Sequence, residues 1–518
     1  MSATRKGPVL MIGIDASQAT LVEQWMADDT LPNLAKLRDR GAYGQLASTA
    51  DWLAGTPWPS FYTSSWPTDH GFFNYLQWRP HLMTHHRPNG SWVPLRPFWR
   101  ELSSEHIRTV AVDVPITYPP GLYDGVEVAG WGSHDRLWPP ATNPPSLIRR
   151  LTREFGDPPM PPEITGLQRV GELLRLREQL IHSTRRASDM ALAFMERYPW
   201  DLFMFVLGAT HRGGHKLWND TGVLDVPSAG EQREFDAALR DVYVACDTAV
   251  GRLLDAAPEN AHIMVFSLHG MGPNNSRYDI MPRMLELILS AGGGERSSSR
   301  TSILGLLKGV RRTLPLEWRS AVKSMLPQRA QDRLALFWQK DRHPDWSRTR
   351  AFAPVGDLEG YVQVNLRGRE AQGIVDPAEY EPLLATITEG LLSFLDQDTG
   401  QRVVDRIGRA HELYPAGPKA DQIADLTIRW VDSPAHTHRT IVSPRYGRVA
   451  WPTINKNPDG RSGHHRNIGW LIAAGQGVQP GSTIRDAHIL DLAPTALSLL
   501  GANQPYPMRG RPVPCLVA

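Results

Sequence analysis

The stretch GPVLMIGID, residues 7–15, decides the fold, because an unbroken apolar run leads from a glycine directly to Asp15. An apolar run of this length is typical of a strand that is buried on both faces of a parallel sheet. The residues that follow such strands meet at one edge of the sheet, where α/β proteins place their chemistry. Asp15 is therefore predicted to lie at a functional edge.

Histidines lie at the ends of the other apolar runs. Their stretches are FMFVLGATHRGGH (203–215) with His211 and His215, IMVFSLHGMG (263–272) with His269, and SGHHRNIGWLIAAG (462–475) with His465. Imidazole and carboxylate groups are ligands for zinc-type divalent metals. The pattern predicts a metal-bearing hydrolase site at the sheet edge, with fewer carboxylates than such a site normally uses.

Strand and helix patterns alternate along most of the chain. Strands are predicted at 8–14, 107–115, 202–208, 261–267 and 467–475, and helices at 172–198, 233–256, 281–291 and 490–500. Alternation of this kind produces right-handed crossovers between parallel strands. It predicts an α/β fold with a mainly parallel central sheet between helices.

A polar break, GGGERSSSRT at 292–301, interrupts this core. We predict an α/β core from 1–291 and 447–518, a basic helical insertion at 292–346, and a smaller α+β lobe at 347–446. The insertion is interpreted as a solvated segment packed on its own domain. Contact of its basic face with anionic lipid or with a partner is the alternative.

The bulk composition narrows the class of function. The 518 residues are 41% hydrophobic and 21% charged with a net charge of +2, which predicts neither nucleic-acid nor membrane binding. With only two cysteines, no disulfide framework or cysteine-based zinc site is expected. The N-terminal apolar run is too short for a secretory signal, and no stretch could span a bilayer, so we expect a soluble, cytoplasmic protein.

Seven motifs occur in an order that resembles a known family. They are GIDAS (13–17), TPWPSFYTSSWPTDHGFF (56–73), VDVPITYPP (112–120), THRGGHKLW (210–218), SLHGMG (267–272), SGHHRNIGW (462–470) and ILDLAPTALSLLG (489–501). In this order they resemble the alkaline phosphatase superfamily, most closely its type I phosphodiesterase/nucleotide pyrophosphatase branch. The resemblance spans nearly the whole chain except the insertion.

The resemblance implies a hydrolase of phosphodiesters or related phosphoryl esters that uses two zinc-type ions and a Thr or Ser nucleophile. Asp15 and His269 match ligands of the ion that activates the nucleophile. Where the family has a carboxylate before this histidine, the chain has Leu268, which cannot bind metal. This second metal site is therefore expected to be weak or absent.

The other half of the implied site is changed in a different way. His211 replaces a carboxylate of the family, and His215 and His465 match its remaining ligands. Because histidine binds zinc, these three side chains imply a three-histidine zinc site with an open fourth position. Arg212, between two of these ligands, either contacts a phosphoryl oxygen of the substrate or points to solvent.

The nucleophile has three candidates in the stretch from Ser48 to Ser60. An ungapped match to the family places Ala54 at the nucleophile position, which would abolish covalent catalysis. A shift of two residues supplies Thr56, which we prefer because Thr-Pro is a good helix N-cap and first-position pair. Ser60 is the third candidate, and the alternative for Thr56 is a role only as a cap.

The leading hypothesis is thus a metal-dependent hydrolase of a small-molecule phosphoryl ester, with Thr56 as the nucleophile. The rival hypothesis is a non-catalytic member of the fold that binds a phosphorylated or anionic ligand. Leu268 and Ala54 are the residues that favour this rival.

Overall fold

The computed structural model describes residues 7–517 except 123, 134–137, 165, 292–344, 357, 435–436, 438, 452–455 and 458. The predicted insertion at 292–346 therefore lies, apart from its last two residues, outside the described residues.

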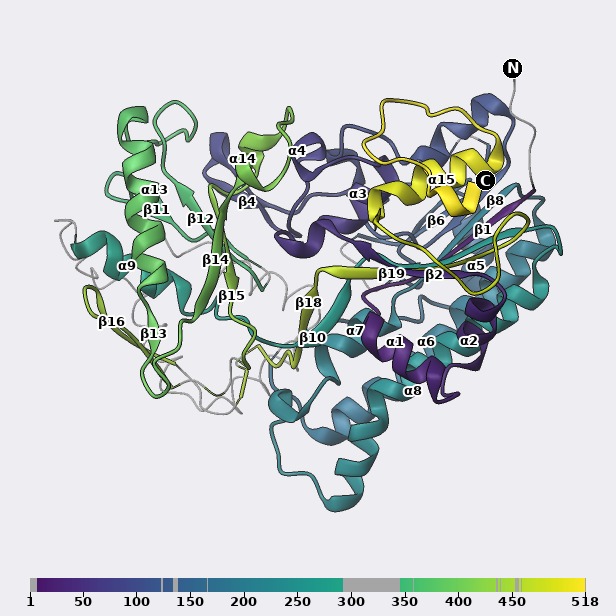
Figure 1. The fold of residues 1–518 in the computed structure, drawn as a ribbon, viewed down its shortest axis with the longest axis horizontal. Coiled ribbons are helices and arrows are strands. Elements are labelled where there is room, and N and C mark those ends of the chain that lie inside the picture. Colours follow the sequence, from purple (N-terminus) through teal and green to yellow (C-terminus); the bar gives the residue numbers. More distant parts are fainter. Residues whose placement is uncertain are drawn as a thin grey trace.

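A 10-stranded sheet forms the centre of the larger part of the molecule, with the order β20-β2-β19-β9-β1-β8-β5-β6-β7 and β21 beside β2 (Figure 1). Its strands are β1 (Val9–Ile14), β2 (Ala42–Ala47), β5 (Thr109–Val112), β6 (Gly125–Ala129), β7 (Ala141–Asn143), β8 (Leu202–Leu207), β9 (His262–Ser267), β19 (Ile468–Ala474), β20 (Ser482–Thr483) and β21 (Ala487–His488). From β9 to β6 the strands are parallel, whereas β19 and β7 are antiparallel to their neighbours. The predicted α/β fold with a mainly parallel sheet is confirmed.

Helices cover both faces of this sheet. They are α1 (Ala19–Ala27), α2 (Pro32–Asp39), α5 (Leu147–Phe155), α6 (Val170–Arg197) and α8 (Ala229–Ala256) on one face, and α3 (Pro57–Thr63), α15 (Leu492–Leu500) and α16 (Pro514–Val517) on the other. Within β1, Leu10 and Ile12 pack towards the first group, and Val9 and Met11 towards the second. The unbroken apolar run of β1 is therefore explained by burial on both faces.

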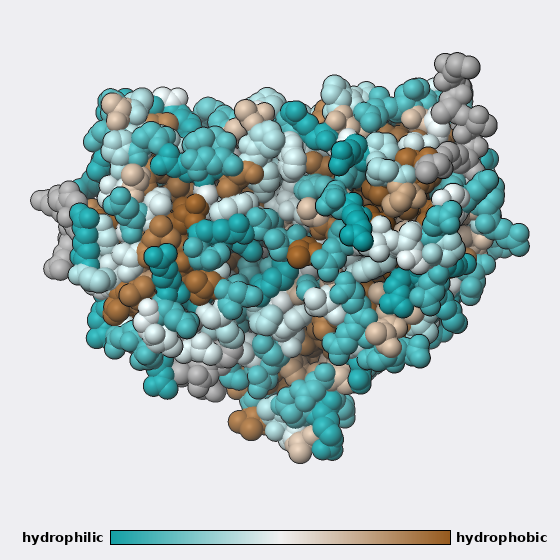
Figure 2. Space-filling model, in the orientation of Figure 1, coloured by the Kyte–Doolittle hydropathy of each residue, from teal (hydrophilic) through white to brown (hydrophobic). Residues whose placement is uncertain are grey.

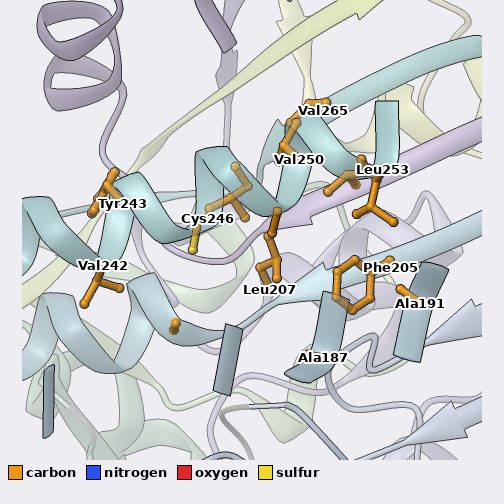
Figure 3. Packing of buried hydrophobic residues seen from close by; sticks show 14 of the residues in the cluster. Ala187, Ala191, Phe205, Leu207, Val242, Tyr243, Cys246, Val250, Leu253 and Val265 are labelled. Carbon is orange, nitrogen blue, oxygen red and sulfur yellow. The ribbon is translucent and has the colours of Figure 1, made fainter. Parts of the chain in front are cut away.

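The packing of α8 shows how the first face is filled. Val250 and Leu253 of α8 belong to one apolar cluster with Phe205 and Leu207 of β8 and Ala187 of α6 (Figure 3).

A second, smaller lobe has its own apolar core. Its strands are β11 (Ala351–Phe352), β12 (Gly360–Val364), β15 (Leu426–Trp430) and β14 (Val404–Arg409) in one antiparallel sheet, and β13 (Leu395–Asp396), β16 (Thr440–Ser443) and β17 (Gly447–Ala450) in another. The helices α9 (Met281–Ala291) and α13 (Pro377–Leu392) pack together in this core (Figure 1). Residues 280–288 and 351–451 contribute to this core, and the predicted lobe at 347–446 stays a prediction.

Three further short elements lie between α3 and β5 in the chain. They are α4 (Pro67–His70) and the hairpin β3 (Gln77–Arg79) with β4 (Thr84–His86). In the lobe, α14 (Ala410–Leu413) follows β14.

The face of the molecule in Figure 2 is covered mainly by hydrophilic side chains, with separate apolar patches. Among the described residues, no helix combines the length and apolarity that crossing a membrane requires.

Candidate metal centre

Asp15 follows β1 at the carboxyl edge of the central sheet, and its side chain is buried. One carboxylate oxygen, Oδ1, accepts a hydrogen bond from Trp58 Nε1 at 2.9 Å. The other, Oδ2, lies 3.0 Å from His211 Nδ1. Because a carboxylate only accepts, this Nδ1 carries the proton and Nε2 keeps the lone pair of the His211 ring.

Helix α7 (Ala209–Lys216) begins directly after β8, beside Asp15, because β1 and β8 pair in register up to Ile14 and Leu207. His211 and His215 lie four residues apart and therefore on one face of α7. His215 Nδ1 donates to the carbonyl oxygen of Gly463 at 2.9 Å. This bond ties α7 to the strand that carries the next histidine.

The remaining two histidines lie at a short antiparallel ribbon of β10 (Gly270–Pro273) and β18 (Gly463–Arg466), His269 directly before β10 and His465 within β18. Met271 pairs with His465 in this ribbon, which brings His465 beside His269 with ring centroids 4.8 Å apart. Successive strand residues point to opposite faces, so His464 points the other way, with its Nε2 4.0 Å from Glu359 Oε1.

We call Asp15, His211, His215, His269 and His465 the histidine cluster. Within it, each of His211, His269 and His465 offers one nitrogen, and these three atoms lie within 4.8 Å of one another. The His215 ring lies 4.9 Å from that of His211 and 4.8 Å from that of His465, between centroids. The structure thus gathers all the sequence-predicted ligands, but their predicted division into two metal sites stays a prediction.

Burial lowers the pKa of His215 and of His465 well below 6.5, and the neighbouring histidines lower both further. These two side chains are therefore neutral imidazoles at pH 7. A neutral imidazole is the form that binds a metal ion, so the donors suit a divalent cation.

Leu268 stands where the family has a carboxylate, and it is fully buried. It belongs to the apolar core on the α3 side of the sheet, together with Trp58 and Phe266. This position is filled by packing and contributes nothing polar to the histidine cluster.

Thr56 precedes α3, but its side chain makes no capping hydrogen bond to that helix. Its hydroxyl donates to the carbonyl oxygen of Leu53 at 2.7 Å and lies 2.7 Å from Thr49 Oγ1. Thr56 thus occupies the N-cap position of α3 with Pro57 after it, as predicted, but its hydroxyl bonds to these two upstream partners and not to the helix. The side chain is fully buried.

Ser60 forms a buried pair with His70, whose Nε2 lies 2.9 Å from Ser60 Oγ. The backbone N–H of Phe72 donates to His70 Nδ1, so the proton of the neutral ring is on Nε2. Burial lowers the pKa of His70 to about 3. His70 thus donates to Ser60 and cannot take its proton, which favours a structural role for this pair. Ala54, the third position considered, is also buried.

Arg212 lies on the face of α7 that also carries Lys216, one turn later. Its side chain is only 6% exposed, so the alternative that it points to solvent is wrong. Lys216 Nζ donates to the carbonyl oxygen of Gly460 at 3.0 Å, and burial lowers the pKa of Lys216 to about 8. The role of Arg212 in binding substrate stays a prediction.

Trp58 is the functional side chain that sequence reasoning did not assign. It lies in the 56–73 motif and donates to Asp15 across 43 residues of sequence. A tryptophan two residues after a candidate nucleophile carries no signal of such a partner, because the contact depends on how α3 lies over β1.

The family model described as type I phosphodiesterase / nucleotide pyrophosphatase matches residues 9–432. The chain belongs to this family. The expected resemblance is thus confirmed. As a member of the type I phosphodiesterase/nucleotide pyrophosphatase family, the chain also shares its fold with distant solved structures.

Two of these are phosphonoacetate hydrolase from Sinorhizobium meliloti, in complex with phosphonoformate and with phosphonoacetate. Each has a TM-score of 0.52 and 13% sequence identity, covering 97% of this chain and 99% of that chain. An inactive variant of murine ectonucleotide pyrophosphatase/phosphodiesterase 5 in complex with AMP gives a TM-score of 0.48 at 11% identity, with 97% of each chain covered. No curated protein matches the chain. At these identities the structures show the fold alone.

Proposed function

We propose that this family member is a divalent-metal-dependent hydrolase of small-molecule phosphoryl esters, with phosphodiesters as the first class to test. One observation carries the proposal: three imidazole nitrogens lie within 4.8 Å of one another at the carboxyl edge of the central sheet. Zinc is the proposed ion, because imidazole is a borderline-soft ligand that suits it. The family to which the chain belongs supports the phosphoryl substrate.

The histidine cluster would hold the ion, which would act as a Lewis acid on a phosphoryl oxygen and neutralise charge in an in-line displacement. The chain itself contributes three things. Asp15 orients His211, burial of the imidazoles limits the access of water, and the hydrogen bond from His215 to Gly463 holds α7 against β18.

Thr56 is the proposed nucleophile. Its Oγ1 would form a bond to phosphorus as the bond to the leaving alcohol breaks, and the leaving oxygen would take the hydroxyl proton. Water would then cleave the threonine ester and restore the hydroxyl. The hydrogen bonds to Leu53 and Thr49 fix the position of this oxygen before the reaction.

The test is turnover of bis-p-nitrophenyl phosphate by zinc-loaded protein and by three variants. We expect Thr56→Ala to lower kcat at least about 100-fold, Thr56→Ser to retain activity within about tenfold, and Ser60→Ala to change little. Chelation should remove the activity and zinc should restore it. Undiminished turnover in Thr56→Ala would show that the nucleophile lies elsewhere.

A second candidate function is non-catalytic binding of a phosphorylated ligand. It is favoured by Leu268, which lies in an apolar core, and by the fully buried hydroxyl of Thr56. Isothermal titration of zinc-loaded protein with inorganic phosphate separates the two. Binding of phosphate without any turnover above that of Thr56→Ala would favour the binding function.

A further inference from the structure

The number of metal ions that the histidine cluster can hold depends on which of its donor atoms face one another. Two ions would need two separate groups of donors, and the family pattern divides the cluster into Asp15 with His269 and the remaining three histidines. In the structure, the three mutually close donor nitrogens belong to His211, His269 and His465, which come from both halves of that pattern.

Asp15 is positioned as the partner of a ligand. Its Oδ2 accepts from His211 Nδ1 at 3.0 Å and its Oδ1 from Trp58 Nε1 at 2.9 Å, so each oxygen already receives one N–H donor. A carboxylate on the far nitrogen of an imidazole fixes the tautomer and makes the other nitrogen a stronger ligand. This hydrogen bond leaves His211 Nε2 as the metal donor.

His215 is used differently. Its Nδ1–H donates to Gly463 O, and the backbone N–H of Ser462 donates to the His215 carbonyl oxygen at 2.8 Å. These two bonds join α7 to the start of β18, next to His465. His215 thus braces the strand that carries a ligand, and its ring packs edge-on against those of His211 and His465.

His465 supplies an independent sign of a ligand. Its side chain is 4% exposed, and its Nδ1 has no hydrogen-bond partner among the described residues. A buried polar atom without a partner costs free energy, which a cation bound at this nitrogen would offset.

From these contacts we infer that the cluster is a single-ion site with His211, His269 and His465 as ligands, with Asp15 as the positioning residue of His211 and His215 as a brace. The inference rests on the proposed metal dependence and replaces the two-ion arrangement of the family. Tetrahedral zinc places ligand nitrogens about 3.4 Å apart, so separations within 4.8 Å close by small side-chain rotations. Three protein ligands leave the fourth position open for an anionic oxygen.

The experiment measures zinc stoichiometry and affinity by isothermal titration of chelator-treated full-length protein, with metal content checked by mass spectrometry. We expect one zinc per chain. His211→Ala, His269→Ala and His465→Ala should each weaken binding by more than about 100-fold, and Asp15→Asn by about 10- to 100-fold with the stoichiometry kept at one. His215→Ala should bind one zinc within about tenfold of the wild-type affinity.

His464→Ala is the matched control, because this equally buried histidine of β18 points away from the cluster, and it should retain full binding. Circular dichroism identifies variants that do not fold, and the Gln variant of the same histidine then replaces the Ala variant. Two zinc ions per chain, or retention in His269→Ala with loss in His215→Ala, would overturn the inference. Because no substrate is present, one bound zinc without turnover would contradict only the proposed function, whereas a wild type that binds no zinc would contradict both.

Discussion

The histidine cluster and the hydroxyl segment, residues 48–70, are the two regions on which the proposed phosphoryl-transfer site depends, and they are built in opposite ways. In the cluster, imidazole nitrogens from α7, β18 and the turn before β10 converge although the residues are far apart in sequence. In the hydroxyl segment, the two candidate nucleophiles are hydrogen-bonded to residues that are near them in sequence. Thr56 bonds to Leu53, and Ser60 to His70.

This difference shows which half of the site the structure supports by itself. Three imidazole nitrogens that converge within 4.8 Å form a group of donors that suits a cation. Buried hydroxyls with internal partners need nothing further, because their hydrogen bonds are already made. The proposed metal site therefore rests on the geometry of its donor atoms, whereas the proposed nucleophile rests on membership of the family.

The largest effect is expected from Leu268→Asp, which tests whether the second half of the family site can be recovered. The new carboxylate would lie in the apolar core beside Phe266, so we expect a loss of about 3–5 kcal/mol in unfolding free energy. Urea unfolding measures it, with Leu268→Met as the volume-matched control. A variant that is as stable as the wild type and binds a second zinc would contradict this account of Leu268.

Zinc itself should stabilise the protein through the histidine cluster and not through the hydroxyl segment. At a free zinc concentration 100 times the Kd, the gain is about 2.7 kcal/mol. Thermal unfolding with and without zinc should show this gain in the wild type and in Thr56→Ala alike. If Thr56→Ala removed the zinc-dependent gain, the two regions would share the ion and the contrast between them would fail.

The hydroxyl segment should be sensitive to acid through His70, whose pKa is lowered to about 3. Below pH 6.5 the unfolded chain takes up a proton at this position and the folded chain does not, so stability falls as the pH falls towards 3. Between pH 6.5 and 5 the loss is about 2 kcal/mol. His70→Gln, compared with the wild type in urea titrations at both pH values, should lack this share of the loss. Equal losses would show that His70 is protonated in the folded protein.

The smallest effect is expected from Trp58→Phe, which removes a hydrogen bond between the hydroxyl segment and the histidine cluster. The variant keeps an aromatic ring but loses the N–H that donates to Asp15 Oδ1. We expect a loss of about 1 kcal/mol in stability and less than about tenfold in zinc affinity. Abolished zinc binding would place Asp15 among the ligands.

Much of the fold was predictable because burial leaves a local signature. The apolar runs of β1, β8 and β9 and the helical spacing of α6 and α8 follow from which faces are covered, so their positions agree with the prediction to within a few residues. The antiparallel direction of β19 and the packing of α9 in the lobe have no such signature. They depend on contacts with segments distant in sequence.

In the candidate site, too, some features could be predicted from the sequence and others depend on contacts between distant segments. Convergence of Asp15 with the histidines was predictable, because residues that follow parallel strands meet at one edge. The orientation of each ring was not, since it depends on hydrogen bonds such as the one between His211 and Asp15, which are 196 residues apart. The direction of the Thr56 hydroxyl has a similar cause, because Thr49 comes within hydrogen-bond distance of it only once the chain has folded around α3.

The most direct test of the central claim, that a divalent ion binds among the three imidazoles, is anomalous diffraction at the zinc edge from crystals grown with zinc. The account predicts one anomalous peak per chain in contact with His211, His269 and His465, and no second peak beside Asp15. No peak in the cluster, or two peaks about 4 Å apart as in two-metal sites, would contradict it.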